Sequence, residues 1–125
     1  MKKPKPFGVE PYVFVLDMRA ATDFYVSRLG FEMTISDGDP PYFVQVMRNG
    51  ARLNLRLVDA AVIDPVRREA EELLSAAVTV DDINGLYAEF SSAGANFLRH
   101  LHTAPWGART FIVRDPDGNL VMFAG

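Results

Sequence analysis

Residues 12–32 read Tyr-Val-Phe-Val-Leu-Asp-Met-Arg-Ala-Ala-Thr-Asp-Phe-Tyr-Val-Ser-Arg-Leu-Gly-Phe-Glu. The stretch begins with a purely apolar run, Tyr12–Leu16, whose β-branched and aromatic side chains predict a strand. Asp17 follows at the position of a helix N-cap, and Gly30 stands where a C-terminal cap belongs. Apolar residues recur at helical spacing between them, so residues 19–29 are predicted to form an amphipathic helix.

The strand and helix of this stretch are followed by three strand-like runs, and the whole series then occurs a second time. Val13 aligns with Val78 and Tyr25 with Phe90, and both pairs are separated by the same offset of 65 positions. Such self-similarity indicates an internal duplication. The predicted strands are residues 12–16, 31–36, 42–47, 53–57, 77–80, 97–103, 109–114 and 120–123, and the second helix covers residues 83–90.

This order of elements predicts the fold class α+β, with two βαβββ modules in a single domain of residues 1–125. Module one covers about residues 9–59 and module two about residues 75–125. Between them, residues 60–74 carry a run of charged side chains, which is typical of a solvated and helical connector.

Composition excludes several classes of function. The chain has no cysteine, which removes disulfides, thiolate nucleophiles and cysteine-based zinc sites. Its formal net charge is −3 and it shows no basic face, so we expect no nucleic-acid partner. No apolar stretch approaches the ~20 residues of a membrane span, and no apolar run of ~7–15 residues follows the basic start Met1–Gly8. We therefore expect a cytoplasmic protein.

Two motifs give the chain a family resemblance. Ala20–Glu32, with its Phe-Tyr pair and Leu-Gly-Phe ending, resembles the first helix of vicinal oxygen chelate proteins, the family of glyoxalase I and the extradiol dioxygenases. Arg114–Asn119 resembles the C-terminal turn of that family, and the preceding Pro105–Gly107 is similar to the bleomycin resistance branch. The resemblance covers about Val9–Phe123. It implies an incomplete barrel around a cavity and a homodimer.

The resemblance also implies four positions that hold a metal ion in other members: Glu10, Asn54, Ser75 and Met122. Among these residue types, the Glu10 carboxylate is the one good ligand for a catalytic divalent ion. Asn coordinates weakly, neutral Ser is a poor ligand and Met prefers soft copper. We therefore expect no metal and no cofactor at these positions, and no catalytic residue can be named.

A relocated metal site is an alternative. His100 and His102 lie two residues apart on a predicted strand, so both are expected to face the same side. With Glu10 as a third donor they would form a metal site. The competing interpretation is that both histidines are exposed or line a pocket without binding an ion.

The expected ligand-binding residues are the side chains that alternation and the family geometry direct toward the cavity. An apolar, aromatic-lined hollow with a few polar groups is typical of small-molecule sites. The single tryptophan is suited to stacking on a flat or cationic ligand, although each aromatic could instead fill the core. The expected set is Glu10, Tyr12, Phe14, Asn54, Arg56, Ser75, Trp106 and Met122.

These observations favour a metal-independent small-molecule-binding protein that sequesters a cationic or aromatic ligand, such as an antibiotic or an aromatic metabolite. Two alternatives stay open. One is a glyoxalase-like lyase or isomerase, or an enzyme related to the dioxygenases, with a relocated or absent metal site. The other is an inactive scaffold that acts as a partner module.

Overall fold

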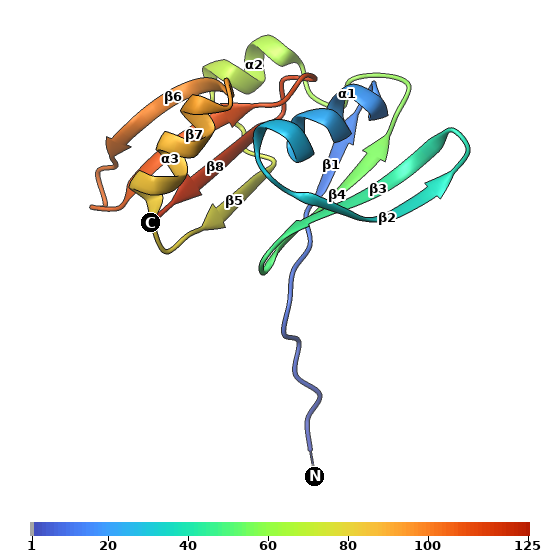
Figure 1. Cartoon of the computed structure of the whole chain (residues 1–125), viewed down its shortest axis with the longest axis horizontal. Helices are drawn as coiled ribbons and strands as arrows, with labels where there is room; N and C mark the ends of the chain where they lie inside the picture. The colour runs from blue at the N-terminus through green and yellow to red at the C-terminus, as the bar shows by residue number, and fades with distance from the viewer. Residues whose placement is uncertain (1) are drawn as a thin grey trace.

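Two four-stranded sheets form the framework of the computed structural model, which describes residues 2–125 (Figure 1). In sheet A the order is β1-β4-β3-β2, and in sheet B it is β5-β8-β7-β6. The first and last strands of each module pair in parallel, and all other pairs are antiparallel. The strands are β1 (Tyr12–Val15), β2 (Glu32–Gly38), β3 (Pro41–Arg48), β4 (Ala51–Leu57), β5 (Ala76–Thr79), β6 (Asn96–Thr103), β7 (Arg109–Arg114) and β8 (Leu120–Ala124).

The predicted α+β fold of two βαβββ modules is confirmed, since each sheet repeats the strand order of the other. Neither sheet closes on itself, which agrees with an incomplete barrel. None of the helices within residues 2–125 is long and apolar enough to cross a membrane. Met1, with which the basic N-terminal stretch begins, lies outside the described residues.

Each module has one helix that begins at an aspartate cap. The Asp17 carboxylate accepts a hydrogen bond from the backbone N–H of Ala20 at the start of α1 (Met18–Asp23). Asp82 accepts in the same way from Gly85 at the start of α3 (Ile83–Ser92). These contacts satisfy backbone donors that the first turn of a helix leaves without a partner.

The helix predicted over residues 19–29 consists of two parts. After α1 the chain continues as a π-helical turn, η1 (Phe24–Arg28), in which the Leu29 N–H bonds to the Phe24 carbonyl five residues back. The connector is less helical than expected, because its helix α2 is limited to Pro65–Ala70.

Alternation along the strands gives each sheet one face that packs against the helices. In sheet A, Val13 and Val15 are fully buried on that face, while Tyr12 and Phe14 on the other face are 52% and 39% exposed. Burial of such apolar side chains supplies the main driving force for this packing. We call the second face, with Tyr12, Phe14, Phe43, Gln45, Asn54 and Arg56, the open face of sheet A.

Two of the side-chain contacts between the modules each join the helix of one module to a residue in or next to a turn of the other. Tyr25 in η1 donates a hydrogen bond to Asp115 in the β7–β8 turn at 3.0 Å. Arg48, next to the β3–β4 turn, donates to both carboxylate oxygens of Glu89 in α3, at 2.6 and 2.9 Å.

The Asp115–Asn119 turn has a larger role than the hairpin that the sequence predicts. Asp115 is buried and accepts hydrogen bonds from the backbone N–H groups of Asp117 and Asn119. The Asn119 carboxamide donates to the Phe14 carbonyl at 2.8 Å and accepts from Arg68 of α2 at 2.7 Å. The turn therefore joins module one, the connector and module two.

Candidate ligand-binding face

A polar cluster lies at the centre of the open face of sheet A. Strand pairing places Asn54 opposite both Tyr12 and Gln45, and the Pro11 carbonyl accepts from the Asn54 backbone N–H. Glu10 is thereby held beside Asn54. The Gln45 Nε2 donates to Glu10 Oε1 at 2.9 Å and to Asn54 Oδ1 at 3.0 Å, and Asn54 Nδ2 donates to Glu10 Oε1 at 3.2 Å. We call Glu10, Gln45 and Asn54 the carboxylate–amide cluster.

Gln45 is not among the binding residues expected from the sequence. The residue lies between Val44 and Val46, which are buried on the helix face, so alternation alone would have directed it to the open face. The resemblance drew attention to the first and last strands of each module, and β3 is neither. The side chain of Gln45 is fixed further because its Oε1 accepts from Thr34 Oγ1 at 2.9 Å.

Aromatic rings lie on the same sheet as this cluster, and one of them, Tyr12, is directly opposite Asn54. Tyr12 lies next to Phe43, with ring centroids 6.1 Å apart. The Arg56 guanidinium lies 5.5 Å from the centroid of the Tyr42 ring, a cation–π distance. Tyr42 in turn donates to Asp37 at 2.6 Å, and this hydrogen bond raises the pKa of the Tyr42 hydroxyl. The open face therefore combines flat apolar surfaces with a fixed polar centre, an arrangement suited to binding a small molecule.

The remaining pair of family metal positions lies on the other sheet. Met122 in β8 is opposite Ala77, and Ser75 precedes β5 and donates to Asn119 Oδ1 at 3.5 Å. Glu10 and Asn54 are therefore hydrogen-bonded to each other within one chain, whereas Met122 lies in sheet B and Ser75 directly precedes it. No hydrogen bond connects the two pairs among residues 2–125.

The expectation that His100 and His102 share a face is wrong. A bulge in β6 lies between Arg99 and His102 and interrupts the alternation on which the expectation depended. His100 turns toward α3, where its Nδ1 lies 2.7 Å from the Tyr87 hydroxyl. His102 is opposite Thr110, on the other side of the sheet.

The proposed relocated metal site of His100, His102 and Glu10 is therefore not formed. The two histidines face opposite sides of sheet B, and Glu10 belongs to the cluster on sheet A. Within residues 2–125 the structure contains no group of three or more His, Cys, Asp or Glu side chains that could hold a metal ion.

Trp106 lies in the β6–β7 loop and is 70% exposed. Gly107 beside it has a φ of 98°, a backbone conformation that favours glycine. The indole is neither part of the core nor in the carboxylate–amide cluster. Its role as a ligand contact stays a prediction.

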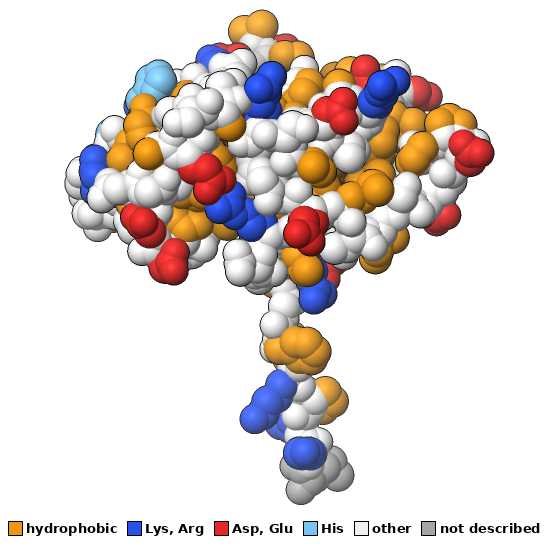
Figure 2. All heavy atoms as spheres, viewed as in Figure 1, with side chains coloured by type: hydrophobic (Ala, Val, Ile, Leu, Met, Phe, Trp, Pro, Cys, Tyr) orange, Lys and Arg blue, Asp and Glu red, His pale blue; other side chains and the backbone are white. Residues whose placement is uncertain are grey.

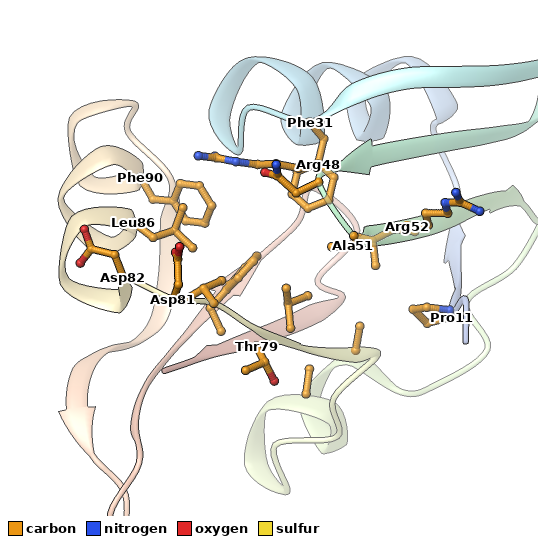
Figure 3. A pocket seen from close by; sticks show the side chains of 18 of the residues that line it. Pro11, Phe31, Arg48, Ala51, Arg52, Thr79, Asp81, Asp82, Leu86 and Phe90 are labelled. Carbon is orange, nitrogen blue, oxygen red and sulfur yellow. The ribbon is translucent and has the colours of Figure 1, made fainter. Parts of the chain in front are cut away.

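A cavity of about 960 Å³ lies elsewhere, between the β3–β4 turn of module one and β5 and α3 of module two (Figure 3). Arg48, Phe31 and Ala51 line one side of it, and Leu86 and Phe90 line the other. None of the eight expected ligand-binding residues lines this cavity. β5 is the edge strand of sheet B, and all of its residues border the cavity.

Comparison with known proteins agrees with this architecture. The chain belongs to the Glyoxalase/Bleomycin resistance protein/Dioxygenase superfamily, whose family model matches residues 9–123. The predicted resemblance, which extended over about Val9–Phe123, is thereby confirmed. Comparison with curated proteins gave no match.

Solved structures of similar proteins include both binding proteins and an enzyme. The bleomycin-binding protein of bleomycin-producing Streptomyces verticillus, solved with copper(II)-bleomycin, is 27% identical with a TM-score of 0.74, over 97% of each chain. TnmS3, an antibiotic-binding protein from a Streptomyces species, is 26% identical with a TM-score of 0.72, over 98% of each chain. Lactoylglutathione lyase from Agrobacterium tumefaciens is 21% identical, covering 98% of this chain and 95% of the lyase, with a TM-score of 0.71. That likeness shows the fold alone.

Proposed function

We propose that this chain is a metal-independent protein that binds a small molecule on the open face of sheet A and sequesters it without transforming it. The observation that carries the proposal is the position of Gln45. Its Nε2 lies 2.9 Å from Glu10 Oε1 and 3.0 Å from Asn54 Oδ1. These are the two residues of module one that the resemblance assigns to a metal ion.

An ion held between Glu10 and Asn54 would need the lone pairs of those oxygens. Both oxygens instead accept hydrogen bonds from the Gln45 amide, whose partial positive charge would also repel a cation. The Asn54 side chain bonds to both other members of the cluster, and its burial makes the loss of these bonds costly. This supports a cluster that serves for hydrogen bonding and not for metal-assisted chemistry.

The ligand class is inferred from the open face and from the relatives. Exposed aromatic rings around a polar centre suit a flat organic molecule. The two binding proteins that are 26% and 27% identical to this chain hold antibiotics according to their descriptions. We therefore propose an antibiotic or an aromatic metabolite as the ligand.

We also propose that the protein acts as a homodimer. Small-molecule sites bury most of the surface of their ligand, and the open face of a single chain is too exposed to do so. The N-terminal arm, residues 2–9, stands away from the body of the molecule (Figure 2). Phe7 and Val9 in this arm are 100% and 92% exposed, so both are available to a second copy.

The cavity next to β5 offers a place for this arm. The unpaired edge of β5 can accept an added strand, and Asp81 beside it provides an acidic group for the lysines of the arm. We propose that residues 1–125 act as a single domain made of the two modules. A cytoplasmic location remains our expectation from the sequence.

A thermal-shift screen tests the proposed function. Tag-free protein is treated with EDTA and screened against antibiotics and aromatic metabolites, and a hit should raise Tm because the ligand binds the folded state alone. Ligand at about 100 times its Kd stabilises by about 2.7 kcal/mol, which corresponds to several degrees for a chain of this size. Backbone amide shifts of β1, β3 and β4 should then change on titration. Turnover of a hit compound would contradict sequestration.

A further inference from the structure

We infer that the ligand presents to the carboxylate–amide cluster a neutral planar group with a hydrogen-bond donor next to an acceptor. A primary carboxamide, a lactam or an aminopyrimidine has such an edge. The inference rests on the proposed function and deepens it, because it names the chemistry that the open face selects.

The Glu10 carboxylate keeps the capacity to accept a hydrogen bond from a ligand. Its Oε1 already accepts from Gln45 Nε2 and Asn54 Nδ2, at 2.9 and 3.2 Å. Its Oε2 has one longer contact, 3.5 Å to the Arg52 guanidinium, which is at the outer limit of a hydrogen bond. The carboxylate is therefore held in place through one oxygen and can accept a better-placed donor at the other.

The opposite charges of Glu10 and Arg52 favour a ligand group without a net charge. The Glu10 and Arg52 side chains are 38% and 53% exposed, so a ligand can reach both of them. A purely cationic group would pair with Glu10 and meet the like charge of Arg52, and a purely anionic group would have the opposite conflict. A neutral group with a donor and an adjacent acceptor satisfies the carboxylate and the guanidinium together.

The surface beside the cluster favours a flat ligand. Tyr12 is directly opposite Asn54 in the sheet and is half exposed, so an aromatic surface adjoins the cluster. Phe43, 6.1 Å from Tyr12 between ring centroids, extends that surface. A flat ligand can lie against these rings while its polar edge points toward Glu10 and Arg52. The open face then recognises both the flat shape of the ligand and its donor–acceptor edge.

Three probes of one shape test this inference: benzamide, benzamidinium and benzoate. Benzamide has a donor and an acceptor, benzamidinium has donors only and benzoate has acceptors only. Their Kd values are measured by NMR titration of backbone amides in β1, β3 and β4. We expect benzamide to bind about fivefold more tightly than either ion, which corresponds to one net hydrogen bond.

The variant Arg52→Ala provides the sharper part of the test. Without the guanidinium, Glu10 has an unopposed charge, so benzamidinium should become the tightest of the three probes. Arg67→Ala removes an exposed arginine that pairs with Glu71 in the connector, and it should leave the order unchanged. The order of the probes reports recognition, which a general loss of stability would not reverse.

The outcomes separate the two proposals. If wild-type protein prefers benzamidinium or benzoate, or if Arg52→Ala leaves the order unchanged, the inferred ligand class is overturned and the proposed function stands. If hits from the screen shift the open-face amides and none of the three probes does so, the inference fails in the same way. If neither hits nor probes shift those amides, the proposed function fails as well.

Discussion

The Tyr25 hydroxyl donates a hydrogen bond to Asp115 Oδ2 at 3.0 Å, across 90 positions of the chain. Both residues are buried, at 0% and 4% exposure. Burial raises the pKa of Tyr25 well above its ordinary value, and the Asp115 charge raises it further. The pKa of Asp115 is raised by burial as well, although its hydrogen bonds act in the opposite direction. This contact helps fix the arrangement of the two modules.

Removing the hydroxyl in Tyr25→Phe should lower the free energy of unfolding by about 1–3 kcal/mol, since a buried carboxylate loses a donor. Urea denaturation at pH 7 measures the change. Tyr42→Phe is the matched control, because its bond to Asp37 lies on the surface, and its effect should stay within about 0.5 kcal/mol. Equal losses of unfolding free energy in the two variants would show that the buried hydrogen bond stabilises the fold no more than the exposed one.

The Arg48–Glu89 ion pair predicts a dependence of stability on pH. The hydrogen bond from Arg48 lowers the pKa of Glu89 below its usual 4.5 in the folded state. The pair therefore contributes its full stability above about pH 4.5, and this contribution is lost as pH falls through the lowered folded pKa. Both side chains are partly exposed, at 32% and 48%, so the pH-dependent part is limited to about 0.5–1 kcal/mol.

Arg48→Met should therefore lose more stability at pH 7 than at pH 3, and the difference between the two losses measures the ion pair. The bond from Arg48 to the Leu29 carbonyl is lost at both pH values and cancels in that difference. Arg19→Met, at an exposed position of α1, is the control. A loss that is the same at both pH values would contradict the assigned role of Glu89.

The Gln45 amide can be exchanged for a carboxylate. Gln45→Glu replaces two donors with acceptors next to Glu10 and Asn54, so the cluster should gain affinity for a divalent ion. We expect at least about a tenfold tighter Kd for Mn²⁺ or Zn²⁺ than in the wild type, measured by calorimetry. Gln45→Met, which adds no anionic ligand, should show no such gain. If the wild-type protein binds the ion as tightly as Gln45→Glu does, the Gln45 amide does not exclude the ion.

The N-terminal arm predicts the behaviour of a shortened chain. Deleting residues 2–8 removes Phe7 and the lysines while leaving Glu10 in place. If the arm packs on a second copy, the dimer should dissociate at least about ten times more readily, as measured by sedimentation. The charge-reversed variant Asp81→Lys, at a residue that lines the cavity, should weaken a dimer of the full-length chain in the same direction. A wild-type chain that remains monomeric at high concentration would contradict the homodimer.

Local patterns were sufficient to predict the strands and the starts of the helices that follow β1 and β5. Asp17 and Asp82 follow strands and cap the helices after them, as their positions suggested. In β4 the alternation of Leu53 and Leu55 with Asn54 correctly separated the helix face from the open face. These features depend on neighbours close in the chain, so a single sequence contains enough information to find them.

Long-range contacts were not predictable in this way. The bulge that turns His100 and His102 to opposite faces depends on the register between β6 and β7, which strand alternation does not contain. The role of Gln45 depends on its hydrogen bond to Glu10, 35 positions away, and the role of Asp115 depends on its hydrogen bond from Tyr25. Such pairs become visible once the sheets are assembled.

The central claim is that the open face binds its ligand while the Gln45 amide, and no ion, bridges Glu10 and Asn54. The most direct test titrates a ligand from the screen into tag-free protein before and after EDTA treatment, with metal analysis of the same samples. We predict an unchanged Kd and no stoichiometric metal. A loss of binding after EDTA that one equivalent of a divalent ion restores would contradict the account.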